Sequence, residues 1–238
     1  MFEADEYKVL NIAVDNYEGM EFRGKPVPSL PAAKRDHAKF RKIMSKYKVE
    51  ITDMLNPEEK EVTKFFCKIA LRAADLKRVR IGKRRTKGGI VLIVYFAGHG
   101  CMIRGSSHIL FNAPEKNMKN PYPLEKLMRD LCASTDGVVF PICLFDCCRE
   151  LISEKARNLA GDEGDAPDLE QLWNIVLVFA CPPGKLVSAE SNFLDQLAEL
   201  LEDYTDENGE LILPGILSKL TGKNRVEVVM SAPQDIRL

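Results

Sequence analysis

The segment GIVLIVYFAGHG (89–100) is an apolar run that ends in a histidine between two glycines. Residues 89–97 carry no charged side chain, which is typical of a strand buried on both faces of a largely parallel sheet. In such sheets the carboxyl ends of the strands open onto the ligand-binding crevice, so His99 stands where chemistry takes place. Glycines on both sides would let a substrate backbone approach closely. The alternative is a histidine that only caps the strand in a tight turn.

The rest of the chain alternates short apolar runs with stretches of helical period, which predicts an α/β fold with a mostly parallel sheet. The other expected strands are 7–14, 47–55, 139–146, 174–180 and 225–231. One helix is expected to begin at Pro31, and a second at Pro57 with Asn56 as its N-terminal cap. Three further helices are expected at 123–133, 190–204 and 211–221. Pro141 lies inside an expected central strand and would remove a ladder hydrogen bond, so we expect a bulge or a strand that begins nearer Ile142.

Composition excludes several classes of protein. With 238 residues and 45% hydrophobic content the chain can bury a large core, which excludes disordered and fibrous proteins. The net charge of −1 gives no field that attracts nucleic acid, and no apolar run reaches the ~18 residues of a membrane span. Seven cysteines without CxxC pairs favour free thiols in a reducing compartment. We therefore expect a cytoplasmic protein with no metal and no cofactor.

Two stretches interrupt the alternation of strands and helices. The basic stretch LKRVRIGKRRTKGG (76–89) fits a solvated loop better than a nucleic-acid contact through 77–87. The stretch ELISEKARNLAGDEGDAPDLEQ (150–171) turns acidic and contains Gly and Pro in its second half. It is typical of an exposed, mobile connector within one domain.

A second motif, CLFDCCRE (143–150), places Asp146, Cys147 and Cys148 at the end of another buried strand. A thiol at a strand end is partly exposed, and a nearby imidazole raises its thiolate fraction, which a nucleophilic cysteine needs. The alternative is two small core residues, because free cysteine is among the most buried residue types. Together with His99, the motif favours a catalytic pair.

The two turns resemble the catalytic motifs of the caspase-fold cysteine peptidases, and the Asp-x-Cys-Arg order is most similar to the paracaspases. His99 and Cys148 are 49 residues apart (148 − 99), close to the ~50 typical of caspases. The resemblance covers essentially the whole chain. It implies a three-layer sandwich, with a six-stranded, mostly parallel sheet and helices on both faces. It also implies one domain, 1–238, composed of a large-subunit-like segment (1–149), a connector (150–171) and a small-subunit-like segment (172–238).

Carried over position by position, the resemblance implies that Cys148 is the nucleophile and His99 its general acid and base. The backbone N–H groups of Gly100 and Cys148 would form the oxyanion hole. Cys147 would be non-catalytic. We therefore expect a cysteine endopeptidase that acts on protein or peptide substrates, and the alternative is a catalytically weak or inactive scaffold with the same fold.

Substrate preference follows from two acids that line the primary pocket in the resembling families, here Asp36 and Asp146. Two carboxylates on one cavity favour a cationic guest, so we expect cleavage after Arg, with Lys as the second choice. The alternative places Asp36 on a helix surface and Asp146 at a turn. The third pocket acid of paracaspases is absent, because Lys185 or Leu186 stands at its place and Glu190 is out of register.

The final expected strand, 225–231, lies at the sheet edge by resemblance. An edge strand has unpaired N–H and C=O groups, and this one has Glu227 as its only acidic residue among valines. We expect it to pair with a second copy of the chain, and the homodimer to be the active form. We expect neither nucleic acid nor a membrane as a partner.

Overall fold

The computed structural model describes residues 4–22, 24–83, 89–103, 106–111, 121–148, 150–151, 175–181, 193–203 and 227–231. Its middle layer is a six-stranded sheet in the order β11-β10-β8-β5-β1-β4. The strands are β1 (Glu6–Ala13), β4 (Glu50–Leu55), β5 (Ile90–Gly98), β8 (Val139–Cys147), β10 (Ile175–Phe179) and β11 (Glu227–Ser231). Neighbours are parallel except β10 and β11. The expected α/β fold with a mostly parallel sheet is confirmed.

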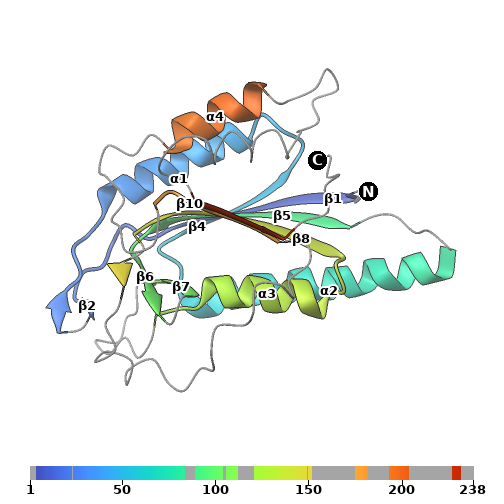
Figure 1. The fold of residues 1–238 in the computed structure, drawn as a ribbon, viewed down its shortest axis with the longest axis horizontal. Helices are drawn as coiled ribbons and strands as arrows, with labels where there is room; N and C mark the ends of the chain where they lie inside the picture. Colours follow the sequence, from blue (N-terminus) through green and yellow to red (C-terminus); the bar gives the residue numbers. More distant parts are fainter. Residues whose placement is uncertain are drawn as a thin grey trace.

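Helices cover both faces of this sheet, as Figure 1 shows. One face carries α1 (Pro31–Met44) and α4 (Phe193–Asp203), and the other carries α2 (Glu59–Lys83) and α3 (Leu124–Ser134). β5 is buried along its whole length and divides its side chains between two cores. Ile93 and Tyr95 pack on the α1 side, whereas Leu92 and Phe96 pack on the α2 side. This arrangement is the expected three-layer sandwich.

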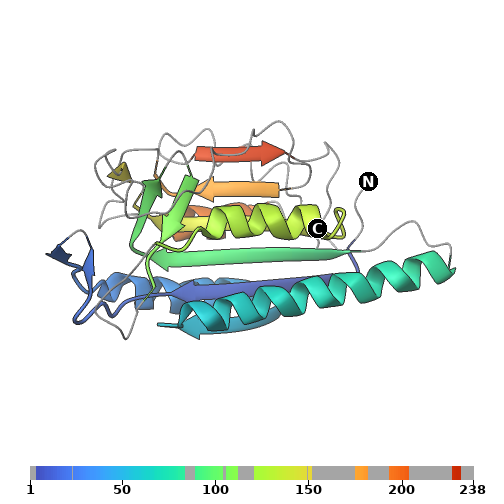
Figure 2. The same cartoon turned by 90° about the horizontal axis from the view of Figure 1, so that it is seen from below.

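Two small sheets lie beyond the carboxyl ends of the parallel strands, and the sequence did not predict them (Figure 2). One is the hairpin of β2 (Glu21–Phe22) and β3 (Lys25–Pro26); the other joins β6 (Gly100–Ile103), β7 (Ser106–Ile109) and β9 (Glu150–Leu151). Cys101 of β6 is the register partner of Glu150 of β9. The turns after β5 and β8 therefore run between the main sheet and this three-stranded sheet, which holds each turn at both ends.

The expected interruption of the strand at Pro141 is wrong. β8 pairs with β5 residue by residue from Val139 to Cys147, and Pro141 lies opposite Leu92 without a bulge. Among the described residues, β10 pairs with β8 only from Ile142 onward. Within the part of the chain that the structure describes, Pro141 therefore loses no ladder hydrogen bond to β10, and a proline is tolerated at such a position.

The expected helix cap at Asn56 is also wrong, because α2 begins at Glu59. The backbone N–H of Glu58 donates to the Glu61 carboxylate (2.8 Å), as in a capping box. Asn56 has a positive φ of 51°, and its side chain accepts hydrogen bonds from the backbone N–H groups of Asp15 and Asn16 (2.9 and 3.1 Å). Asn56 thus connects the end of β4 to the end of β1.

The basic stretch 76–89 is helical over its first eight residues. α2 continues to Lys83, so residues 76–83 are helical and the expectation of a loop is wrong for them. Residues 84–88, most of the connector (152–171) and the expected helix 211–221 lie outside the described residues. None of the helices that the structure describes is long and apolar enough to cross a membrane.

Candidate active site

The turns that carry His99 and Cys148 lie side by side at the carboxyl ends of β5 and β8. Gly98 is the register partner of Cys147, so the next residues, His99 and Cys148, leave neighbouring parallel strands at the same level. Both are partly exposed. A Cβ on Gly100 would lie 2.6 Å from the Cys147 Sγ and 2.8 Å from the Cys148 carbonyl oxygen. Only glycine lets the two turns pack this closely.

A buried tyrosine, Tyr17, fixes the backbone of His99. The His99 N–H donates to the Tyr17 hydroxyl (2.8 Å), and this hydroxyl donates to the carbonyl of Leu110 (3.3 Å). The Leu110 N–H donates to the His99 carbonyl (3.0 Å), which closes a cycle of hydrogen bonds. The Tyr17 and His99 rings are also in contact, with centroids 4.7 Å apart. A Cβ on Gly98 would lie 2.8 Å from the Tyr17 hydroxyl oxygen, so this glycine makes room for the tyrosine.

The imidazole of His99 is oriented by a backbone carbonyl. Its Nε2 lies 2.9 Å from the carbonyl oxygen of Pro28, in the segment that leads into α1. A carbonyl oxygen only accepts hydrogen bonds, so the neutral imidazole must carry its proton on Nε2. Nδ1 then keeps the lone pair and is the basic nitrogen. The sequence gives no signal for Pro28, because any residue supplies a carbonyl.

The two adjacent cysteines have different environments. Cys147 is 3% exposed, and burial, with further contributions from neighbouring thiols, raises the pKa of its thiol well above the usual value. Its carbonyl accepts a hydrogen bond from the Cys181 thiol at the end of β10 (3.4 Å). Cys148 is partly exposed. A buried, protonated thiol is inert, so Cys148 is the accessible thiol of the pair.

The structure brings Asp36 and Asp146 together from α1 and β8. Burial and the charge of Asp36 raise the pKa of Asp146 to about 6. The Tyr95 hydroxyl donates to the Asp146 carboxylate (3.1 Å), and the Tyr95 ring stacks on Phe40 with centroids 4.3 Å apart. Phe40 follows Asp36 by one helical turn, so the helix face that packs on the sheet also points Asp36 toward Asp146.

A third carboxylate, Asp195, acts on Asp36. The pKa of Asp36 is raised by burial first and also by Asp195, while Lys39 and Arg35 oppose the shift. Asp195 lies in the first turn of α4 and pairs with Lys39 (2.6 Å). Sequence reasoning missed Asp195, since nothing in the chain connects it to Asp36 before the two helices pack together. The positions considered for a third acid, 185, 186 and 190, lie outside the described residues.

We expect Asp146 to titrate near pH 6 in the folded protein and at lower pH in Asp36→Asn, because that change removes a like charge. Carboxyl-carbon NMR measures both titrations. The raised pKa also lowers stability as pH rises from the ordinary 3.8 toward 6, because the native state alone keeps the proton in this window. Asp146→Asn should remove that slope from the free energy of unfolding. An Asp146 titration near pH 4, unchanged in Asp36→Asn, would contradict the pairing of the two acids.

Comparison with known proteins agrees with this architecture. A family model described as the caspase domain matches residues 8–223. A search of curated proteins returned no match. The matched segment contains the helices on both faces of the sheet and the turns after β5 and β8. The chain therefore belongs to the caspase-domain family of cysteine peptidases.

Proposed function

We propose that this protein is a cysteine endopeptidase in which His99 and Cys148 form the catalytic pair. The packing of the Gly100 turn against residues 147 and 148 is the observation that carries the proposal. Two further observations support it: the Pro28 carbonyl leaves Nδ1 as the base, and Cys148 is the more accessible of the two adjacent thiols. The free cysteines support a reducing, cytoplasmic location.

The chemistry proceeds in two steps. Nδ1 of His99 takes the proton of Cys148, and the thiolate attacks the scissile carbonyl carbon. The N–H groups of Gly100 and Cys148 stabilise the oxyanion, and His99 returns the proton to the leaving amine as the C–N bond breaks. His99 then deprotonates a water molecule, which hydrolyses the thioester and restores the thiol. Throughout, the Pro28 carbonyl holds Nε2–H and stabilises the imidazolium.

We expect Cys148→Ala to lower kcat/KM by on the order of 10³-fold or more, with His99→Ala comparably severe because the two residues act as a unit. Cys147→Ala should keep substantial activity, since the Cys147 thiol is buried and protonated. Fluorogenic peptide cleavage measures the rates, and circular dichroism checks that each variant folds. An inactive Cys147→Ala beside an active Cys148→Ala would refute the assignment. A folded wild type that binds peptide without cleaving it would indicate the scaffold alternative.

We further propose that the enzyme cleaves after Arg, with Lys as the second choice. The raised pKa of Asp146 supports a pocket in which two carboxyls converge and repel. A guanidinium group can hydrogen-bond two carboxylates through its planar fork, and its charge relieves their repulsion. Asp195 adds negative charge near Asp36, and this charge also favours a cationic side chain of the substrate.

Asp36→Asn and Asp146→Asn should each lower kcat/KM for an arginyl peptide by roughly tenfold, because each removes a full charge from a partly buried pocket. The measurement compares peptides that differ only in Arg, Lys or Asp before the scissile bond. Wild-type cleavage after Arg should rise as pH passes about 6, where Asp146 ionises, and Asp146→Asn should lose this rise. Unchanged arginyl kinetics in both variants would exclude these acids from the pocket.

Tyr17 should act as a positioning residue for His99. Tyr17→Phe leaves the His99 N–H and the Leu110 carbonyl without the shared hydroxyl, so we expect kcat to fall about tenfold with little change in KM. Tyr122→Phe is the matched control, because Tyr122 is also buried and its hydroxyl bonds Thr63 (3.1 Å) instead of the catalytic turn. Equal losses of kcat in the two variants would indicate that Tyr17 contributes only to stability and does not position His99.

We also propose that the active form is a homodimer joined through β11 and that it needs no cleavage of the connector 150–171. β11 stands at the end of the sheet order, antiparallel to β10, and within the described ranges no strand pairs with its outer side. An identical strand would satisfy its unpaired backbone groups and close the assembly about a two-fold axis. The edge position of β11 is the observation that supports this proposal.

Val228→Lys should weaken the dimer, because near a two-fold axis the new charge meets its own copy. Light scattering and specific activity over a concentration series measure both effects. We expect wild-type mass and specific activity to rise together with concentration, and both to fall in the variant. A wild type that stays monomeric with concentration-independent activity would contradict activation through β11.

A further inference from the structure

A groove at the edge of the sheet opposite β11 is separate from the candidate active site. It has a volume of about 490 Å³ and lies between the edge strand β4 and helix α2. Met54 and Phe65, both partly buried, and the buried Ile69 form its apolar part. The groove is within the ~300–1,000 Å³ range of binding pockets. β1 separates β4 from β5, so an occupant of the groove would not touch the turn of His99.

The backbone of β4 offers a place for an additional strand. β4 pairs with β1 on one side, and among the residues that the structure describes no strand pairs with its other side. Figure 2 shows α2 running alongside the strands at this edge. Thr52 and Met54 face α2 and the groove, whereas Asp53 faces α1 and binds Arg41 (2.9 Å). A strand added here would satisfy the outward N–H and C=O groups of β4 and cover the groove.

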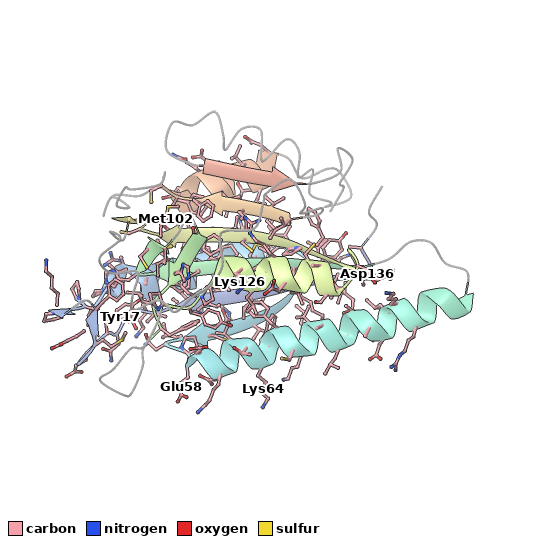
Figure 3. All side chains as sticks on the ribbon, turned by 60° about the horizontal axis from the view of Figure 1, so that its bottom comes forward. Tyr17, Glu58, Lys64, Met102, Lys126 and Asp136 are labelled. Carbon is pink, nitrogen blue, oxygen red and sulfur yellow. The ribbon has the colours of Figure 1, made fainter. Side chains whose placement is uncertain are left out.

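The charges around the groove select the chemistry of that strand. Lys64 and Lys68 are exposed on α2, and no ion pair is found for either among the described residues. The side chain of Lys64 extends outward from α2 in Figure 3. The lining of the groove carries four cationic side chains, including Lys8 and Arg72, against the two carboxylates of Glu50 and Glu61. Glu50 pairs with Lys8, whereas Glu61 keeps its charge while it accepts the Glu58 N–H. The unbalanced charge of the groove is therefore positive.

The lysines also have the spacing of a strand. Residues four apart on a helix are separated by about 6.0 Å along its axis. Alternate residues of a strand are separated by about 6.6 Å and point to the same side. A strand beside β4 would thus present every second side chain at nearly the spacing of Lys64 and Lys68. Glutamate fits these positions well, because its methylene groups can cover Met54 and Phe65 while its carboxylate reaches a lysine.

We propose that this groove is a docking site for an extended acidic segment of a partner protein, which adds as a strand to β4 and pairs alternate acidic side chains with Lys64 and Lys68. A nucleic acid would bind the lysines, but it would pair neither with the backbone of β4 nor with the apolar part of the groove. The site is independent of the proposed peptidase centre. In a peptidase it recruits protein substrates or regulators whose acidic segment lies outside the cleaved sequence.

Fluorescence anisotropy with a fluorescein-labelled peptide TEVETEVET tests the proposal on the wild-type protein. We expect saturable binding, little binding of the neutral peptide TQVQTQVQT, and slower amide hydrogen exchange in β4 when the acidic peptide is bound. Lys64→Glu/Lys68→Glu should weaken binding by about tenfold or more, because two exposed ion pairs become repulsive. Cleavage of a short fluorogenic peptide should be unchanged in this variant, which separates the groove from the catalytic pair.

Lys34→Glu/Lys42→Glu is the matched control, because it makes the same change of charge on exposed positions of α1, on the opposite face of the sheet. It should keep the affinity of the wild type. The proposal fails if the acidic peptide does not bind, or if both double variants weaken it equally. It also fails if a peptide with N-methylated amides binds as well, which would mean charge attraction without strand addition. Tighter binding of a single-stranded oligonucleotide at the lysines would assign the groove to nucleic acid instead. Self-association that is lost in Lys64→Glu/Lys68→Glu would assign it to a second copy of the chain.

Discussion

The close approach of Gly100 to the turn at residues 147 and 148 is the contact on which the candidate site depends. A single methyl group at this position would overlap the Cys147 thiol and the Cys148 carbonyl. Protein interiors are close-packed and do not absorb such an overlap without moving backbone. The parallel register of β5 and β8 brings the two turns to the same level, and the missing side chain lets them touch. Tyr17 occupies the space that the missing side chain of Gly98 leaves free, and its hydroxyl fixes the backbone of His99.

The acid pair shows how the fold stores unfavourable free energy at the same edge of the sheet. A shift of the Asp146 pKa from 3.8 to about 6 corresponds to roughly 3 kcal/mol against its ionised form. The packing of Phe40 on Tyr95 holds α1, and with it Asp36, against the strand that carries Asp146. At neutral pH the ionised Asp146 therefore lies in an unfavourable environment beside Asp36. In the proposed pocket a bound cationic side chain would relieve this penalty, so part of the unfavourable free energy would contribute to substrate selectivity.

The sequence was informative where local pattern determines structure. Apolar runs located all six strands of the main sheet, and the residues that follow β5 and β8 predicted the two turns that the structure places side by side. The predictions were wrong where a contact with a residue far away in the sequence determines the local structure. Asn56 has the pattern of a helix cap, yet its side chain binds the end of β1. Pro141 is typical of a strand breaker, yet β10 does not reach it among the described residues. Pro28 and Tyr17 act on His99 from far away in the chain, through a carbonyl and a hydroxyl that no spacing rule detects.

Covalent labelling tests whether this packing makes Cys148 a nucleophile that faces an acidic pocket. The folded protein is treated with an arginyl peptide chloromethyl ketone, and the modified cysteine is located by tandem mass spectrometry. Iodoacetamide provides the control, because it should modify the exposed Cys67 regardless of the site. We expect an arginyl adduct on Cys148 that is lost in His99→Ala and is not formed by the matching aspartyl reagent. An adduct on Cys147 or Cys67 instead would contradict Cys148 as the nucleophile, and equal labelling by both reagents would contradict the acidic pocket.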